Sequence, residues 1–337
     1  MSKIRLGVIG PGIIWERAHK PALKKFSNRF EIAAFCATSE KSKNKINKEY
    51  PGMPFYKDYK LLVKESFIDA VIVMTPIPMN PVVAIEALDA GKDVFLEKPM
   101  ATNVKDGKEL VKKEKETGKR VFVLEQYAYK SLVDEMITIV NSGRLGDVLM
   151  FDRLFHGYIG FKDGVEDYGN TEWRIKPAFP LGMLLDGGIH EIAMLSKIFG
   201  KPLTVYAAGV KYRQEYGDYD YESMIFEYKN NLIGTFSNSY FLDGNRNYFI
   251  VRGTKGLAFY EEDLKIVVEE NSGRRDVVKI SDENPYYRMW KIFSKCLETN
   301  SKPYYTTEIA LNDLQILEAI EKSLKKGIKV SVNDWKF

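Results

Sequence analysis

Two short segments of the sequence carry side chains suited to proton transfer. The segment LLDGGIHEIAML places Asp186 and His190 four residues apart, around two glycines. Four residues make about one turn of a helix, so the carboxylate and the imidazole would share one face. The segment VFLEKPMATN places Lys98 between Glu97 and Pro99. An imidazole that titrates near neutral pH and a lysine ammonium can move a proton or stabilise charge on a substrate oxygen.

Structural interpretations of the same residues compete with catalysis. Asp186 is also a good N-cap for the helix that follows it, and His190 could pack on the face of that helix. Lys98 could be a surface lysine in a turn between a strand and a helix. We predict that Asp186 caps the helix and takes part in the chemistry as well. A metal centre is not expected, because His19, His156 and His190 are the only histidines and no cluster of other ligands accompanies them.

The composition limits the classes of protein to which the chain can belong. With 337 residues, of which 45% are hydrophobic and 28% charged, two soluble globular domains are expected. The net charge of +4 is spread along the sequence without a basic patch, so we predict no nucleic-acid partner. Cys36 and Cys296 indicate buried thiols in a reducing compartment. No apolar run has the length of a membrane span or the form of a secretory signal, which favours a cytoplasmic protein.

The N-terminal part of the sequence alternates between short apolar runs and amphipathic segments. This alternation predicts buried strands joined by helices, that is, a doubly wound parallel sheet. The expected strands are IRLGVIG, EIAAFCA, a short strand near 54–56, DAVIVMT, DVFLE and RVFVLEQ. The expected helices span 18–26, 42–49, 59–65, 81–90 and 104–117.

After residue 126 the pattern changes. A helix over 131–142 and a long strand in GRLGDVLMFDRLFHGY precede the helix that begins at Asp186. Strand-like segments then follow one another without intervening helices, which predicts an α+β domain with an open, largely antiparallel sheet. These segments are TVYAAGVKY, ESMIFEYKN, LIGTFSNSYF, NYFIVRGTKG, GLAFYEED and LKIVVEE. We therefore expect one domain over 1–125 and a second over 126–337.

The segment GVIGPGIIW indicates that the first domain binds a dinucleotide. Gly10 and Gly12 lie between the first strand and the first helix. At this place a tight turn and a close approach to a pyrophosphate both need glycine, and the helix N-terminus offers N–H donors. An ordinary glycine-rich turn is the alternative, but the motif opens the first βαβ unit, which favours a cofactor site.

The residues after the second strand bear on the choice between NAD(H) and NADP(H). An acidic residue usually binds the ribose 2′-hydroxyl of NAD there, whereas FCATSEKSKNK offers Thr38, Ser39 and Lys43. Hydroxyls and lysines suit a 2′-phosphate better, so we favour NADP(H), with NAD(H) as the alternative because Glu40 is adjacent. MTPIP and EKP follow two further strands and should border the same crevice. The predicted cofactor contacts are Gly10, Gly12, Ile13, Ile14, Thr38, Ser39, Lys43, Thr75, Pro76, Asn80, Glu97, Lys98 and Gln126.

Four motifs together resemble those of a known family. GPG after the first strand, TP after the fourth, AGKDVFLEKP at the fifth and DGGIH in the second domain resemble the glucose–fructose oxidoreductase, inositol dehydrogenase and rhizopine-catabolism (Gfo/Idh/MocA) family. The resemblance covers essentially the whole chain. It implies that Lys98, Asp186 and His190 form the catalytic group. It also implies that the second domain carries the substrate and the interface of an oligomer.

The sequence departs from the usual family motifs at three places. Trp15 stands where a small residue usually follows the glycine turn, which bears on how the first helix begins over the pyrophosphate. Asn80 in TPIPMN stands where a histidine often occurs, and LEQYAYK lacks an arginine often found there. None of these changes removes a catalytic residue.

The expected activity is hydride transfer between a nicotinamide cofactor and a secondary alcohol or ketone of a sugar, polyol or sugar derivative. A glycoside-cleaving enzyme that holds its cofactor tightly and a non-enzymatic cofactor-binding regulator remain alternatives, although the intact catalytic group weighs against the regulator. Trp173 and Arg174 could contact cofactor or substrate, with loop packing as the alternative. Tyr127, Arg153 and Tyr158 are further candidates for the substrate pocket.

The second domain also carries a signal for self-association. ESMIFEYKN and LIGTFSNSYF alternate large apolar and polar residues, which predicts a sheet with a face that needs cover. We therefore expect a homodimer or homotetramer.

Overall fold

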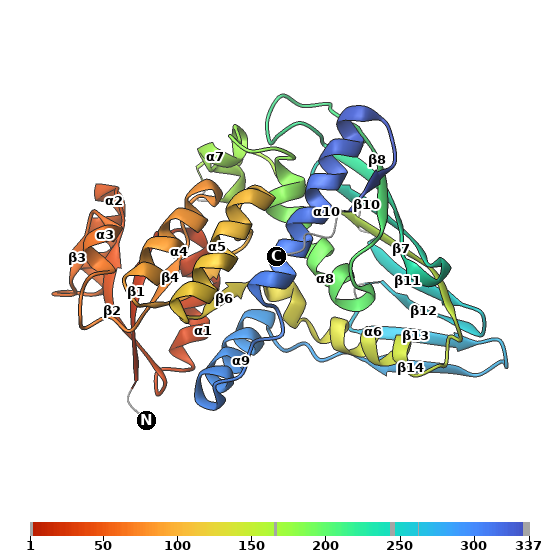
Figure 1. The fold of residues 1–337 in the computed structure, drawn as a ribbon, viewed down its shortest axis with the longest axis horizontal. Helices are drawn as coiled ribbons and strands as arrows, with labels where there is room; N and C mark the ends of the chain where they lie inside the picture. Colours follow the sequence, from red (N-terminus) through yellow and green to blue (C-terminus); the bar gives the residue numbers. More distant parts are fainter. Residues whose placement is uncertain (1–2, 165–166, 243–246, 262, 333–337) are drawn as a thin grey trace. The chain divides into compact units, whose positions relative to one another are not determined.

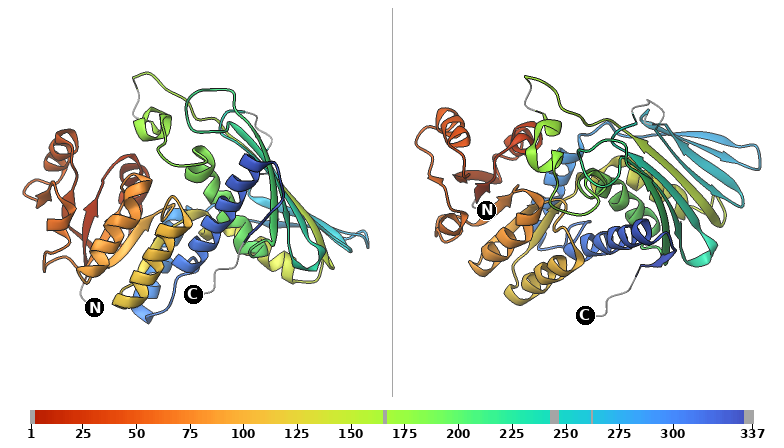
Figure 2. Two further views of the ribbon diagram at one scale, coloured as in Figure 1. Left: turned by 45° about the horizontal axis from the view of Figure 1, so that its top comes forward. Right: turned by 90° about the horizontal axis from the view of Figure 1, so that it is seen from above.

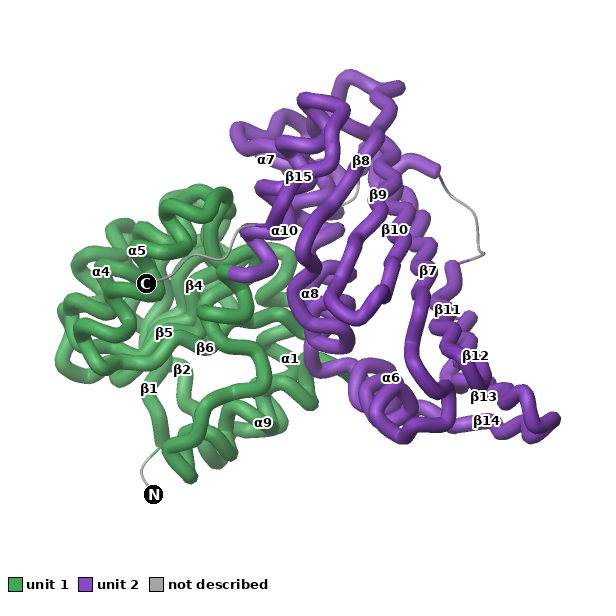
Figure 3. Tube along the Cα trace, turned by 45° about the vertical axis from the view of Figure 1, so that its right-hand side comes forward, with its two compact units in different colours: residues 1–126, 284–311 green, residues 127–283, 312–337 purple. Residues whose placement is uncertain are grey.

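The structure, a computed structural model, describes residues 3–164, 167–242, 247–261 and 263–332. The chain forms two compact units, residues 1–126 with 284–311 and residues 127–283 with 312–337 (Figure 3). The first unit is therefore assembled from two separate pieces of chain, whereas the sequence suggested a single division after residue 125.

The first unit contains a six-stranded parallel sheet in the order β3-β2-β1-β4-β5-β6 (Figure 1). β4 and β6 are buried along their whole length, as expected of strands covered on both faces. The strand order changes direction between β1 and β4, and ligands of such sheets bind where these two strands end. The predicted doubly wound sheet is thus confirmed. Its strands are β1 (Ile4–Ile9), β2 (Phe30–Cys36), β3 (Phe55–Tyr56), β4 (Ala70–Val73), β5 (Asp93–Glu97) and β6 (Val121–Leu124).

Local sequence signals set the ends of the connecting helices. Asn103 caps the last of them through its Oδ1, which accepts from the Asp106 N–H at 2.9 Å, and that helix stops at Gly118 with φ of 63°. These helices are α1 (Lys20–Lys24), α2 (Glu40–Glu49), α3 (Tyr59–Leu62), α4 (Asn80–Asp89) and α5 (Val104–Thr117).

The second piece of the first unit contributes α9 (Pro285–Thr299). One face of this helix carries large rings that pack on the sheet: Trp290 lies 4.8 Å from Phe95, and Phe293 lies 5.1 Å from Phe122, between ring centroids. All four rings are almost fully buried. Burial of this aromatic surface explains why a segment so distant in sequence returns to the first unit.

The second unit is built on a nine-stranded sheet in the order β14-β13-β12-β11-β7-β10-β9-β8-β15. Among the described strands of this second sheet, only the central β7–β10 pair is parallel, so the prediction of a largely antiparallel sheet is confirmed. The strands are β7 (Val148–His156), β8 (Thr204–Val210), β9 (Tyr221–Glu227), β10 (Ile233–Ser239), β11 (Tyr248–Gly253), β12 (Gly256–Tyr260), β13 (Lys265–Glu270), β14 (Arg275–Lys279) and β15 (Val330–Ser331).

Helices cover one face of the second sheet. Figure 2 shows α8 (Ile189–Phe199) and α10 (Thr307–Lys326) on the same side of the strands, with no described helix on the other side. The ring of Phe199 in α8 stacks on Phe151 of β7 at 4.4 Å and 7°. Two further helices belong to this unit, α6 (Ser131–Asn141) and α7 (Glu172–Ile175).

Candidate active site

The turn after β1 has the shape that a dinucleotide requires. Gly10 has a φ of 75°, and a Cβ there would lie 2.6 Å from the Met74 carbonyl oxygen, so a larger residue would push the turn off the end of β4. Gly12 is exposed, and a Cβ built on it would come no closer to other atoms than 3.9 Å, at the Gly10 oxygen. The backbone of Gly12 is therefore open to close approach by a pyrophosphate, and the turn fits the cofactor.

The first helical turn after these glycines is unusual. Residues Trp15–His19 form a π-helical segment, and Trp15 is fully buried with its ring edge-on to Phe35 at 5.9 Å. This widened turn agrees with the expectation that tryptophan at this position changes the start of the helix. The neighbouring Ile13 and Ile14 are half-buried at the same turn.

The end of β2 presents the hydroxyls and the lysine expected there. Thr38 and Ser39 are exposed, and Lys43 is half-exposed. Ser39 also caps α2, because its Oγ accepts from the Ser42 N–H at 3.1 Å. Glu40, which argued against NADP(H), is ion-paired with Lys57, and this pairing offsets its negative charge.

Asn80 joins the ends of β4 and β5 and is fully buried. Its Oδ1 accepts from the Thr75 hydroxyl at 2.9 Å, while its Nδ2 donates to the carbonyl oxygens of Glu97 at 3.0 Å and Pro99 at 2.9 Å. The side chain thus holds the turn that carries Lys98. Of the other predicted cofactor contacts, Pro76 is exposed and Gln126 is 6% exposed after β6.

A buried polar network lies on the other flank of the Lys98 turn. The Glu97 Oε2 accepts from the Lys98 backbone N–H at 3.0 Å, and its Oε1 lies 2.6 Å from Nε2 of His19. Nδ1 of His19 in turn accepts from the Trp290 Nε1–H at 3.1 Å. The network unites the first helical segment, the end of β5 and α9 within the first unit.

In the second unit, Asp186 lies in a π-helical segment, Leu184–Gly188, that runs directly into α8. The prediction that Asp186 caps this helix is wrong, because no side-chain cap hydrogen bond is formed at the start of either segment. Instead, Asp186 is 4% exposed and its Oδ2 accepts from Nε of Arg174 at 2.6 Å. The carboxylate is therefore held by a charged partner rather than by the helix N-terminus.

Arg174 links Asp186 to an aromatic surface. Its guanidinium lies 4.0 Å from the ring centroid of Trp173 and 5.1 Å from that of Tyr168. Trp173 and Arg174, both predicted as site residues, are thus brought together with Asp186. A guanidinium between aromatic faces and a carboxylate is fixed in place, so it can present its donors in a constant direction.

His190, the second residue of α8, is half-exposed and stacks on the ring of Tyr127 at 4.6 Å and 18°. The Lys130 ammonium lies over the ring of Tyr127, 3.1 Å from its centroid. Tyr127 was predicted as a substrate contact, and the structure shows it beside the imidazole. The stack restrains the plane in which the imidazole can exchange a proton.

Gly187 of the DGGIH motif lets this helical segment approach the end of β10 closely, because a Cβ there would lie 2.3 Å from the Tyr240 ring. Gly188 lies 3.5 Å, measured from the place of a Cβ, from Oδ1 of Asn238 in β10. Asn238 Nδ2 donates to Glu222 Oε2 at 2.9 Å. Burial raises the pKa of Glu222 to about 8, although the hydrogen bond from Asn238 opposes the rise. Burial therefore disfavours the charged form of Glu222 beneath the motif.

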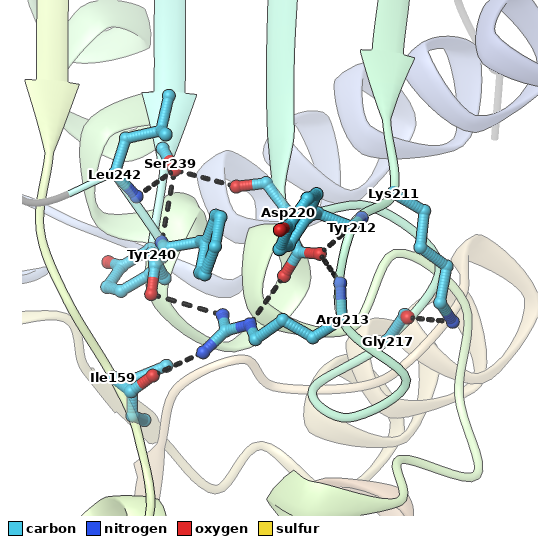
Figure 4. Close-up of polar contacts among 10 residues, drawn as sticks. Ile159, Lys211, Tyr212, Arg213, Gly217, Asp220, Ser239, Tyr240 and Leu242 are labelled. Atoms are coloured by element: carbon cyan, nitrogen blue, oxygen red, sulfur yellow. Dashed lines mark hydrogen bonds and ion pairs between the residues drawn. The ribbon is translucent and has the colours of Figure 1, made fainter.

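Arg213 ties together the loops at this end of the sheet (Figure 4). It donates from Nε to Asp220 Oδ1 at 2.7 Å, from Nη1 to the Ile159 carbonyl at 2.5 Å, and from Nη2 to the Tyr240 carbonyl at 3.1 Å. Burial alone would raise the pKa of Asp220, but the hydrogen bonds of Arg213 lower it below its ordinary value. Through Tyr240, this network supports the helix that carries Asp186.

Arg153 is buried and paired with a carboxylate of α8. It is 3% exposed and donates from Nε and Nη2 to the two oxygens of Glu191, at 2.7 and 3.0 Å, and from Nη1 to the Tyr248 carbonyl. Arg153 compensates the buried charge of Glu191 and joins α8 to β7, and its role as a substrate contact stays a prediction. Tyr158, in contrast, is 58% exposed in the loop after β7.

Sequence reasoning gave no role to His19, Trp290, Glu222 or Arg213. The recurrence of Tyr286, Met289, Trp290 and Phe293 at helical spacing is the signal that could have identified α9. Two classes of feature are absent from the described residues: a group of three or more side chains able to hold a metal ion, and a helix long and apolar enough to span a membrane.

Comparisons with known proteins agree with this arrangement. Residues 4–125 match the family model described as "Oxidoreductase family, NAD-binding Rossmann fold", and residues 133–259 match the GFO/IDH/MocA C-terminal domain. A crystal structure of an oxidoreductase from Thermotoga maritima is 31% identical, with a TM-score of 0.89 over 98% of this chain and 99% of that one.

Two enzymes are also similar in sequence. scyllo-Inositol 2-dehydrogenase (NADP(+)) of Bacillus subtilis is 23% identical over 96% of this chain and 94% of its own length. Trans-1,2-dihydrobenzene-1,2-diol dehydrogenase of Bos taurus is 26% identical over 76% of this chain and 73% of its own. With both domain models and a full-length structural relative in agreement, the chain belongs to the Gfo/Idh/MocA family of NAD-binding oxidoreductases.

Proposed function

We propose that the protein is an NAD(P)-dependent dehydrogenase or reductase that interconverts a secondary alcohol and a ketone on a sugar or polyol. The observation that carries the proposal is that one chain of this family holds both Lys98 and the Asp186–His190 pair in ordered surroundings. Lys98 stands on a turn in which buried side chains bind its own N–H and the carbonyls of the residues on either side. Asp186 and His190 lie in one helical segment, the first bound by Arg174 and the second stacked on Tyr127.

Each group has a distinct part in the proposed reaction. The cofactor, when bound, accepts or supplies the hydride, and the Gly10–Gly12 turn together with Thr38, Ser39 and Lys43 would hold it. His190 exchanges the hydroxyl proton as general base or general acid. Lys98 stabilises the negative charge that develops on the same oxygen. Asp186 accepts a hydrogen bond from a substrate hydroxyl while Arg174 fixes its orientation.

Ring-bound hydroxyls on adjacent carbons are the substrate class we favour. Both similar enzymes are named for such substrates, an inositol and a dihydrodiol of benzene. Asp186 and Arg174 support this choice, since a carboxylate acceptor beside guanidinium donors can bind a second hydroxyl next to the reacting one. Trp173 offers an apolar surface for the face of the ring.

A substrate screen tests this function. Purified protein is mixed with NADP+ or NAD+ and with inositols, pyranoses, cyclic diols and nucleotide-linked sugars, and absorbance of the reduced nicotinamide is followed. We expect net reduction with at least one cyclic polyol. Release of a sugar from a glycoside without net reduction would instead identify a glycoside-cleaving enzyme. Cofactor binding without any turnover would identify a regulator.

Cofactor choice gives a specific prediction. NADP(H) is expected to bind more tightly than NAD(H), and Ser39→Asp is expected to narrow or reverse this preference, because a carboxylate repels the 2′-phosphate. Aspartate is as good an N-cap as serine, so the melting temperature should stay near that of the parent. Titration of both cofactors measures the ratio of dissociation constants, with Asn47→Asp, which places the same charge at an exposed position of α2, as the control. A clear preference of the unaltered protein for NAD(H) would contradict the prediction.

A further prediction is that the protein self-associates through the uncovered face of the second sheet. Tyr206 and Ile225 are paired neighbours on β8 and β9, and both are more than 40% exposed on that face, as is Ile233 on β10. We expect a homodimer or homotetramer, and Ile225→Glu should shift it toward the 38.7 kDa monomer because a charge cannot be buried there unpaired. Sedimentation equilibrium at micromolar concentration measures the mass. Leu61→Glu, on α3 of the first unit, is the control; a monomeric parent would refute the prediction.

A further inference from the structure

We propose that His19 and Trp290 act as a positioning relay that fixes the main chain at Lys98 by holding the Glu97 carboxylate in one orientation. The proposal rests on the proposed function, in which Lys98 is the charge-stabilising residue. It concerns residues that touch neither substrate nor cofactor in this assignment. They act through Glu97 and the turn that Glu97 holds.

The donors and acceptors of the relay determine the tautomer of His19. An indole N–H is only a donor, so the Trp290 Nε1–H must donate to Nδ1 of His19, 3.1 Å away. Nδ1 then carries no proton, and the neutral ring carries its proton on Nε2. That N–H points to Oε1 of Glu97 at 2.6 Å. Trp290 therefore fixes the direction in which His19 donates.

Glu97 connects His19 to the turn that carries Lys98. With Oε1 engaged by His19, its other oxygen accepts from the Lys98 backbone N–H at 3.0 Å. On the opposite flank, Asn80 binds the carbonyls of Glu97 and Pro99. The main chain around Lys98 is thus held by hydrogen bonds on both sides.

The environment of His19 indicates that its hydrogen bonds have a role other than filling space. His19 is fully buried, Trp290 is fully buried, and Glu97 is 7% exposed. The imidazole also has the rings of Tyr286 and Trp290 edge-on at 5.4 and 5.9 Å. An apolar side chain would fill such an aromatic site without the cost of burying polar atoms. Three residues from distant segments form a chain of hydrogen bonds that ends at the Lys98 main chain, which is typical of residues that support a functional group.

Two substitutions test the relay at different points. Trp290→Phe keeps a ring on α9 but removes the donor to Nδ1. We expect kcat to fall about three- to tenfold, with KM and cofactor affinity unchanged, because one neutral hydrogen bond is lost and the turn keeps its other supports. His19→Leu leaves an oxygen of Glu97 buried without a donor and should lower kcat about ten- to a hundredfold.

A conservative variant and a packing control separate positioning from stability. His19→Gln can still accept from Trp290 and donate to Glu97, so it should recover most of the kcat lost in His19→Leu. Phe293→Leu loosens the same aromatic cluster without touching a hydrogen bond, so it should lower the melting temperature but leave kcat near the parent value. Equal losses in His19→Gln and His19→Leu, or a loss in Phe293→Leu equal to that in Trp290→Phe, would overturn the relay.

Nitrogen NMR provides a readout that does not depend on turnover. The protein contains three histidines, so ¹⁵N-labelled histidine gives few signals to assign. His19 of the parent should show the single Nε2–H tautomer, whereas Trp290→Phe should show a mixture of tautomers. An unchanged spectrum in Trp290→Phe would overturn the relay. Full turnover of Lys98→Met would instead overturn the proposed function, and the spectrum would report on His19 independently.

Discussion

Replacing Lys98 with methionine is expected to lower kcat by roughly two to four powers of ten, the usual worth of one group that stabilises charge in a transition state. Methionine keeps the length and apolar stem of lysine but cannot carry positive charge. Cofactor affinity should change little, because the contacts proposed for pyrophosphate and ribose lie after β1 and β2. Steady-state kinetics on the substrate identified by the screen measures the loss, with Lys105→Met, an exposed lysine of α5, as the matched control.

His190→Ala should produce a loss of similar size, and the double variant decides whether the two residues serve one reaction. Groups that act in the same transition state are strongly non-additive. The Lys98→Met/His190→Ala protein should therefore be much less impaired than the product of the two single losses. Independent, multiplying losses would show that the residues support different steps. A Lys98→Met protein with full turnover would remove lysine from the mechanism altogether.

Replacing Arg153 with methionine is expected to reduce the free energy of unfolding by about 3–5 kcal/mol, because it leaves the charge of Glu191 buried and uncompensated. Urea denaturation measures this. The double variant Arg153→Met/Glu191→Leu should regain most of the stability, since apolar side chains of similar size can replace a buried ion pair. The free energy of unfolding of Arg153→Lys should lie between those of the parent and Arg153→Met, because an ammonium cannot bind both carboxylate oxygens as a fork.

The same pair has a predictable dependence on pH. Burial would raise the pKa of Glu191, but the charge and hydrogen bonds of Arg153 outweigh it and lower the pKa below its ordinary value. In the parent, the pair therefore contributes stability above the pKa of an unfolded glutamate, about 4.3, and this contribution is lost as pH falls through the folded pKa. In Arg153→Met the largest influence that lowers the pKa of Glu191 is lost and only the charges of Lys130 and His190 still oppose burial. The pKa of Glu191 should therefore be higher than in the parent, and its protonation should relieve part of the cost of the buried charge. The stability difference should shrink toward acid pH; a difference that grows would contradict the assignment.

The sequence predicted most of the first unit for a clear physical reason. Strands buried on both faces are continuous apolar runs, so segments such as 70–73 and 121–124 are visible without knowledge of their neighbours. The Lys98 motif and the glycine turn are equally local. The packing of 284–311 on the first unit could not be predicted in this way, because it depends on complementary aromatic surfaces more than 150 residues apart.

The roles of single polar residues were harder to predict because they depend on partners. Asp186 has the residue type of an N-cap, but a nearby guanidinium binds it instead. The sequence also gave no sign that Arg153 forms an ion pair with the buried Glu191 of α8. His19 gave no signal at all, since its partners Glu97 and Trp290 lie 78 and 271 positions away.

The two-piece construction of the first unit has a consequence for synthesis on the ribosome. The rings of Phe95 and Phe122 emerge early, but Trp290 and Phe293, which cover them, are made much later. At roughly 5–20 residues per second, the intervening stretch between 126 and 284 takes about 10–30 s to translate. During that time the nascent sheet exposes an aromatic surface of the kind that chaperones bind. The first unit can therefore finish folding only after residues 127–283, the larger piece of the second unit, have been translated.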